Sequence, residues 1–323
     1  MSASKLQQAD TFGDWGKIAI AKYFAKTIDR ESQVLADKDV EALHQMRVGM
    51  RSLRSAISLF SPALILPKTV SERKIAKIAK ILGKLRDIDV LQDTLDSQYK
   101  PLLPPEEKKQ LHIASKKLAR QRKVAVKKVR KILKSETYRN LKQDLQQWLQ
   151  CSQHTAVAAI SIEDILPDLL SIQVSQLLMH PGWLVGTKIV AGEISLVKNH
   201  TSQEIEKIAR DRDNPLHDLR KEIKKTRYNL TFFTEFYSNT YRKYLKKIEL
   251  AQEVLGNIQD SIVLEKFLAK SSHKKICQQM PTMITILRKT RSENWQTWLQ
   301  LQAIFCDYRQ RQELRSILHY PQR

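Results

Sequence analysis

The chain has 323 residues, 42% of them hydrophobic, and its 56 Lys and Arg outnumber its 34 Asp and Glu to give a formal net charge of +22. This length and apolar content allow one large or two ordinary domains and exclude a disordered basic tail. Only 8 Gly and 10 Pro are present, which disfavours turn-rich strand architectures, so we predict an all-α protein.

The cysteines and the apolar segments exclude further classes of protein. Cys151, Cys277 and Cys306 lie far apart, so no disulfide framework or metal-ligand spacing arises. No run of about 18 uncharged apolar residues occurs, as a membrane-spanning helix would require. The first 17 residues also lack the apolar core of a secretory signal. We therefore expect a cytoplasmic protein that has no membrane span, metal or cofactor.

Hydrophobic periodicity predicts four helices in each half of the chain. In residues 1–150 they cover about 12–35, 40–60, 71–97 and 105–150, the last broken near Ser135. Residues 151–187 hold no Lys or Arg and are predicted to be an apolar connector packed against protein. In residues 188–323 the helices cover about 190–211, 215–238, 241–270 and 281–315. Helices joined by short loops pack antiparallel, which predicts two four-helix bundles.

An internal repeat relates the two halves. Residues 43–60 align with 216–233 at an offset of 173, and the same offset aligns 82–91 with 255–264. In the second pair of segments the spacing LGxxxDxxVL is common to both copies. Agreement over about 50 residues without an insertion predicts an internal duplication with pseudo-symmetric halves.

The first repeated segment is amphipathic when it is wound at about 100° per residue. Its basic stripe spans about 80° and consists of His44, Arg47, Arg51 and Arg54. Its apolar stripe consists of Met46, Met50, Leu53, Ile57 and Phe60. In the second copy the basic stripe is His217, Arg220, Lys224 and Arg227, and the apolar one is Leu219, Ile223, Leu230 and Phe233.

Like charges one turn apart repel on an isolated helix, and neither basic stripe contains an acid to offset this. Arginine and lysine donate hydrogen bonds to phosphate oxygens, as does protonated histidine. Two such stripes in register therefore predict a polyanion site; the alternative is a solvated surface face.

Other charged residues extend this candidate site. Cations matched between the copies are Arg73, Lys74, Lys246 and Lys247. Residues 108–134 contain twelve Lys or Arg and no acid, and the possible extension comprises Lys116, Lys117, Arg120, Lys123, Lys127, Arg130 and, in the second half, Arg288. The matched acids Asp87 and Asp260 are expected to pair with a site cation and fix its orientation, although a simple salt bridge between helices is equally open.

The pattern H-x-x-R with further basic residues and the LGxxxDxxV motif, both duplicated, resembles the CHAD domain (conserved histidine α-helical domain). The resemblance covers nearly the whole chain and implies two pseudo-symmetric four-helix bundles that bind inorganic polyphosphate on a basic surface between them. A further reading is a scaffold or granule-associated protein that uses polyphosphate binding for its location. Some members carry a triphosphate-tunnel enzyme domain marked by ExExK; the nearest string here, Glu204–Lys207, has the wrong spacing. We therefore expect a stand-alone member.

Two alternatives remain for function. Phosphoryl chemistry needs carboxylates that hold a metal, or a nucleophile, and no P-loop or HExxH occurs, so we expect no enzyme. Nucleic acid or another polyanion could also be the ligand, since its phosphates attract the same cations. Single-stranded nucleic acid would favour aromatics on the basic face. Phe232, Phe233, Phe236 and Tyr237 instead follow the apolar side, so polyphosphate is the preferred ligand.

Overall fold

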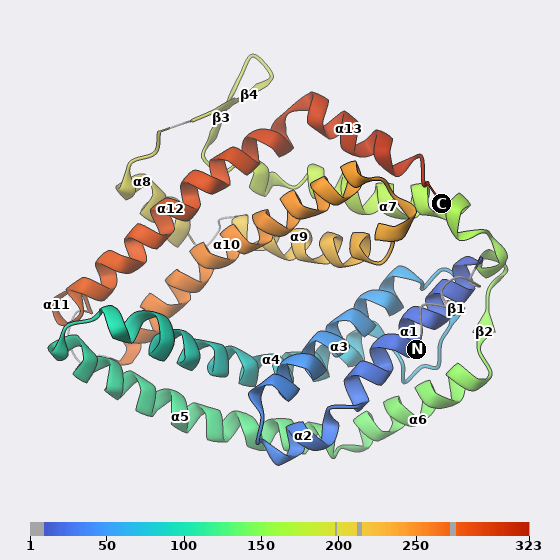
Figure 1. The fold of residues 1–323 in the computed structure, drawn as a ribbon, viewed down its shortest axis with the longest axis horizontal. Coiled ribbons are helices and arrows are strands. Elements are labelled where there is room, and N and C mark those ends of the chain that lie inside the picture. Colours follow the sequence, from blue (N-terminus) through green and yellow to red (C-terminus); the bar gives the residue numbers. More distant parts are fainter. Residues whose placement is uncertain (1–9, 198, 212–214, 272–275, 323) are drawn as a thin grey trace. The chain divides into compact units, whose positions relative to one another are not determined.

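The computed structural model describes residues 10–197, 199–211, 215–271 and 276–322, and these are almost entirely helical (Figure 1). The strands in this part of the chain form only two short antiparallel pairs, β1 with β2 and β3 with β4. The all-α prediction is therefore confirmed. The chain divides into two compact units, residues 1–98 with 115–165 and residues 99–114 with 166–323.

In unit 1 the observed helices follow the predicted ones, except that the helix predicted at 12–35 is divided into two helices at Asp29 and Arg30. The predicted break near Ser135 is present, because the Ser135 side chain caps the start of the helix Glu136–Gln150. The elements of unit 1 are α1 (Phe12–Ile28), α2 (Glu31–Ala36), α3 (Val40–Leu59), β1 (Leu64–Ile65), α4 (Glu72–Thr94), most of α5 (Pro105–Leu133), α6 (Glu136–Gln150) and β2 (Gln153–His154). A π-helical turn, Leu95–Tyr99, follows α4. The first ten residues of α5 belong to unit 2.

Helix α3 lies at the centre of unit 1 because it packs against both α1 and α4. Its predicted apolar stripe forms the core, since Met46, Met50, Leu53 and Ile57 are all buried. Phe60, directly after the helix, is also buried and lies against Phe12, with ring centroids 5.2 Å apart. The opposite side of α3 is thereby left for the basic stripe.

Unit 2 is organised around α9 and α10 in the same way. Its elements after α5 are α7 (Ile162–Leu178), β3 (Thr187–Val190), β4 (Glu193–Leu196), α8 (Ser202–Arg210), α9 (Leu216–Thr231), α10 (Asn239–Ser271), α11 (Ile276–Gln279), α12 (Pro281–Cys306) and α13 (Tyr308–Leu318). Helix α10 packs against α9 and α12. The predicted apolar residues Leu219, Ile223, Leu230 and Phe233 are buried, and Trp183 stacks on Trp298 with ring centroids 5.2 Å apart.

Two predicted helices in the second half are wrong in part. Residues 190–211 begin with a β-hairpin, because the alternating segments of β3 and β4 flank Ala191 and Gly192, whose φ angles of 51° and 82° form its turn. The helix predicted at 281–315 ends at Cys306, because the Asp307 side chain accepts a hydrogen bond from Gln310 N and starts α13. The apolar segment 151–187 contains α7, whose Leu166, Leu170 and Val174 are fully buried.

Candidate functional site

The basic stripe of unit 1 lies on the face of α3 that faces away from its apolar core. Asp39 caps α3 by accepting a hydrogen bond from Glu41 N, so the helix begins one turn before His44. His44, Arg47 and Arg51 are half-buried, and Arg54 is exposed. The stripe thus offers cationic groups that are partly held by protein and partly open to solvent.

Arg47 reaches across to α4. Its Nη2 lies 3.8 Å from Oδ1 of Asp87, and its guanidinium lies over Gly83, one turn earlier on α4. The Arg47 side chain is 24% exposed, whereas that of Asp87 is 73% exposed. The expected pairing between Asp87 and a site arginine is therefore present, but it is a long ion pair whose acid faces solvent.

Arg220 makes the same arrangement in unit 2. Its Nη2 lies 3.9 Å from Oδ2 of Asp260, and its guanidinium lies over Gly256 of α10. The two side chains are 26% and 73% exposed. Each unit thus holds an arginine from one helix against a glycine and an aspartate of the next helix.

The arginines at the far end of each stripe have closer acidic partners. Arg54 donates from Nε to Glu72 at 2.9 Å, and its Nη2 lies 2.8 Å from the same oxygen. Arg227 donates to Glu249. These two carboxylates come from the neighbouring helices α4 and α10, so the helical periodicity of the stripes gave no signal for them.

The pKa of the histidine in each stripe is lowered. Partial burial is the main cause of the lowered pKa of His44, and the charge of Arg86 lowers it further. Arg86 lies outside the predicted site. The pKa of His217 is likewise lowered, first by partial burial and then by Lys221, while Asp218 opposes the shift. In the free protein both imidazoles therefore become protonated at a lower pH than an ordinary histidine does.

The further matched cations differ in their surroundings. Arg73 and Lys246 are exposed. Lys74 donates to the carbonyl oxygen of Lys68 at 2.9 Å. Lys247 lies over the Tyr244 ring, 4.5 Å from its centroid, and donates to Gln310 at 3.3 Å. The half-buried Lys224 of the second stripe lies on α9 between Arg220 and Arg227.

Most of the basic extension on α5 is exposed to solvent: Lys116, Lys117, Arg120, Lys123 and Lys127. Arg130 instead donates to the carbonyl oxygens of Leu35 and Ala36, at 3.0 and 3.4 Å. It therefore caps the C-terminal end of α2. Arg288, the candidate on α12, is exposed.

Two arginines outside the predicted site form structural networks. Arg122 on α5 donates to both carboxylate oxygens of Asp37, at 2.8 and 2.7 Å, and to Asp89 at 2.8 Å. Arg291 on α12 is fully buried and binds Glu206 and Glu265. Each joins a short helix or its cap to the long helix α4 or α10. Their partners lie far away in sequence, so the sequence pattern did not reveal these networks.

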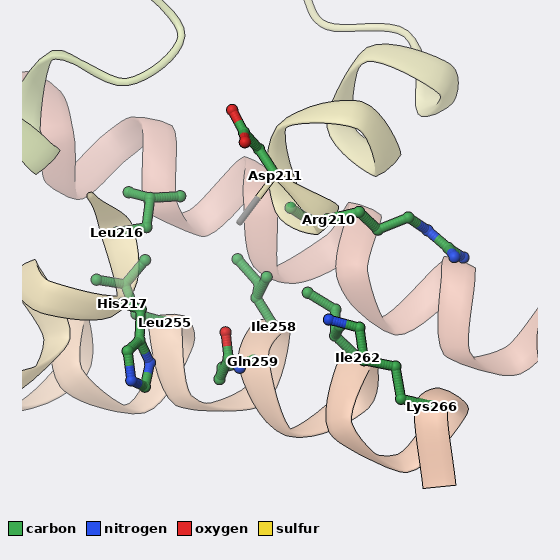
Figure 2. A pocket seen from close by; sticks show the side chains of 10 residues that line it. Arg210, Asp211, Leu216, His217, Leu255, Ile258, Gln259, Ile262 and Lys266 are labelled. Carbon is green, nitrogen blue, oxygen red and sulfur yellow. The ribbon is translucent and has the colours of Figure 1, made fainter. Parts of the chain in front are cut away.

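A cavity of about 240 Å³ lies beside the second stripe in unit 2 (Figure 2). His217 and Gln259 lie at one side of it and Lys266 at another, while Leu255, Ile258 and Ile262 supply much of its apolar wall. No three His, Cys, Asp or Glu side chains of the described residues come together in a way that could hold a metal ion.

The comparison with known families agrees with this arrangement, because the CHAD domain profile matches residues 18–269. The chain belongs to the CHAD domain family. Its fold is similar to the crystal structure of the CHAD domain from the plant Ricinus communis, with a TM-score of 0.60 and 23% identity over 97% of this chain and 95% of that one. It is also similar to PptA from Streptomyces chartreusis, with a TM-score of 0.58 and 12% identity over 94% of this chain and 100% of that one. No curated protein matches the chain in sequence.

Proposed function

We propose that the protein binds inorganic polyphosphate without turnover, through the basic stripes of α3 and α9. The observation that carries this proposal is the matched placement of Arg47 and Arg220, each 3.8 to 3.9 Å from an exposed aspartate. A surface ion pair contributes only about 0–1 kcal/mol, whereas hydrogen bonds to charged groups contribute about 1.5–3 kcal/mol. Phosphate oxygens can therefore replace the aspartates at little cost.

Nucleic acid is the second candidate ligand, and the placement of the aromatic side chains counts against it. Phe233 and Phe236, close to the second stripe, are fully buried in the core and cannot stack on bases, whereas Phe232 is half-buried and the half-buried Tyr228 ring is covered by the guanidinium of Arg227. Polyphosphate needs no stacking surface because it consists of charged phosphate groups and has no bases. The cationic stripes suit such a ligand better.

Competition distinguishes these ligands. Long-chain polyphosphate is bound at about physiological salt and challenged with equal phosphate concentrations of RNA and of duplex DNA. We expect polyphosphate to bind more than about tenfold tighter, a difference of about 1.4 kcal/mol. Equal displacement by RNA would instead identify a general polyanion surface. The chain length of the bound polyphosphate, measured over hours, should stay constant; shortening would contradict binding without turnover.

The proposed ligand also suggests where in the cell the protein is located. None of the helices in the described part of the chain is both long and apolar enough to cross a bilayer. We propose that the protein acts in the cytoplasm, at polyphosphate granules. A fluorescent fusion should form foci that disappear when cellular polyphosphate is depleted, and foci that persist would contradict this.

A further inference from the structure

Two buried glycines occupy positions where glycine is unfavourable. Gly83 lies within α4 and Gly256 within α10, and glycine in a helix interior is less stable than alanine. Among the described glycines only Gly186 and Gly192 have a positive φ. Backbone geometry therefore does not require glycine at position 83 or 256.

The space above each glycine is occupied by an arginine of the basic stripe. A Cβ on Gly256 would lie 3.0 Å from Nη2 and 3.3 Å from Nε of Arg220. A Cβ on Gly83 would lie 3.4 Å from Nε of Arg47. The favourable separation of non-bonded heavy atoms is about 3.5–4.0 Å, so a methyl group would crowd the guanidinium at position 256 and touch it at position 83.

We propose that Gly83 and Gly256 are positioning residues for polyphosphate binding. Each lets a guanidinium lie close to one turn of the next helix, with Nη2 3.8 to 3.9 Å from an exposed aspartate at the following turn. This inference rests on the proposed function, since the ordered guanidinium is what would meet phosphate. Holding a flexible side chain in its binding position reduces the entropy lost on binding.

The test compares Gly256→Ala, Gly83→Ala and the control Asn257→Ala, an exposed neighbour on α10 whose side chain donates to Asn294. We expect Gly256→Ala to weaken polyphosphate binding about threefold to tenfold, since ordering one long side chain costs this much. Gly83→Ala should have a smaller effect, and Asn257→Ala none. An equal loss in Asn257→Ala, or no loss in Gly256→Ala, would overturn the proposal.

A double-mutant cycle shows whether the effect passes through the arginine. In an Arg220→Ala background, Gly256→Ala should leave binding unchanged, because no guanidinium remains to be displaced. The same loss in both backgrounds would assign Gly256 to helix packing instead.

Thermal unfolding separates failure of this inference from failure of the proposed function. If the unsubstituted protein binds no polyphosphate, the proposed function is wrong, yet the positioning contact can still be measured. Gly256→Ala should raise the unfolding midpoint more in the Arg220→Ala background than in the presence of Arg220, because only Arg220 crowds the new methyl group. Equal shifts in the two backgrounds would show that the contact does not exist.

Discussion

Arg47 and Arg220 hold their acidic partners more weakly than Arg54 and Arg227 do. Their aspartates lie 3.8 and 3.9 Å away and are 73% exposed. Arg54, by contrast, lies within 2.8 Å of Glu72. A ligand that binds Arg54 must displace a closer carboxylate, so we assign the larger share of binding to Arg47 and Arg220.

The histidines predict a pH dependence of binding. Burial and nearby cations lower the pKa of His44 and His217 in the free protein, whereas a bound phosphate would raise both pKa values. Affinity should therefore rise as the pH falls through the raised pKa of the complex, and level off below the lowered pKa of the free protein. Titrations from about pH 8 to about pH 5.5, on either side of the usual histidine pKa of about 6.5, measure the rise in affinity.

The control for this prediction is the double variant His44→Gln, His217→Gln. Glutamine keeps a hydrogen-bond donor but does not titrate, so most of the pH dependence should disappear. If the double variant keeps the full pH response, the imidazoles do not contact phosphate.

Substitution of Arg291 and of Arg288 should change stability by very different amounts, although the two residues lie one turn apart on α12. Arg291 is fully buried and binds two glutamates, whereas Arg288 is exposed. Arg291→Ala removes a partner of both Glu206 and Glu265, so it should lower the free energy of unfolding by about 3–5 kcal/mol. Arg288→Ala should change stability by less than about 0.5 kcal/mol. Urea unfolding followed by tryptophan fluorescence measures both; similar losses would contradict the buried network.

At the scale of helices, amphipathic periodicity predicted the elements that carry the site. Residues 40–60 and 71–97 were expected to be helices and correspond to α3 and α4. The hairpin of β3 and β4 was missed because its alternation is only four residues long on each side of Ala191 and Gly192. Segments this short fit either a helix or a strand, because the two are usually distinguished by the length of the pattern.

The sequence predicted which site residues share a face of one helix, but not the contacts that join different helices. Periodicity placed His44, Arg47, Arg51 and Arg54 on one face, and the repeat singled out Asp87 and Asp260. It could not show that Glu72 pairs with Arg54 or that Asp89 binds Arg122. Those contacts join different helices, so they depend on packing angles that local sequence does not determine.

The start of α12 depends on a residue from another helix. Glu107 of α5 is buried and accepts hydrogen bonds from Thr282 N at 2.8 Å and Met283 N at 2.9 Å. It thus satisfies two backbone donors of the first turn of α12. Glu107→Ala should destabilise unit 2 by about 1–2 kcal/mol, as loss of a helix cap does. The neighbouring exposed Glu106→Ala is the control, and equal unfolding midpoints for the two variants would contradict this role.

For the whole molecule, both units contain two similar kinds of interaction. Each has an arginine over a glycine and near an aspartate, and each has a second arginine in an acidic network. This agrees with the internal duplication, which stays a prediction. The basic residues are unequally divided, because residues 1–150 hold 31 Lys and Arg of the total of 56.

Binding through several cations predicts a steep dependence on salt. The two stripes contain six Arg and Lys side chains: Arg47, Arg51, Arg54, Arg220, Lys224 and Arg227. By analogy with nucleic-acid binding, each phosphate contact releases condensed counterions. A protein that makes about six such contacts should therefore lose about 10³-fold in affinity when the salt concentration rises from 50 to 200 mM. Affinity that changes less than about tenfold over this range would mean that few of these side chains bind at once.

The central claim is that polyphosphate binds the two stripes rather than the general positive charge. Its most direct test is to compare polyphosphate affinity between two variants that each lose two charges, Arg47→Ala with Arg220→Ala and Lys123→Ala with Lys127→Ala. Both lysines are exposed on α5. We expect the arginine variant to lose at least about tenfold more affinity, since each hydrogen bond to a charged group contributes about 1.5–3 kcal/mol. Equal losses would contradict the claim and indicate diffuse electrostatic attraction.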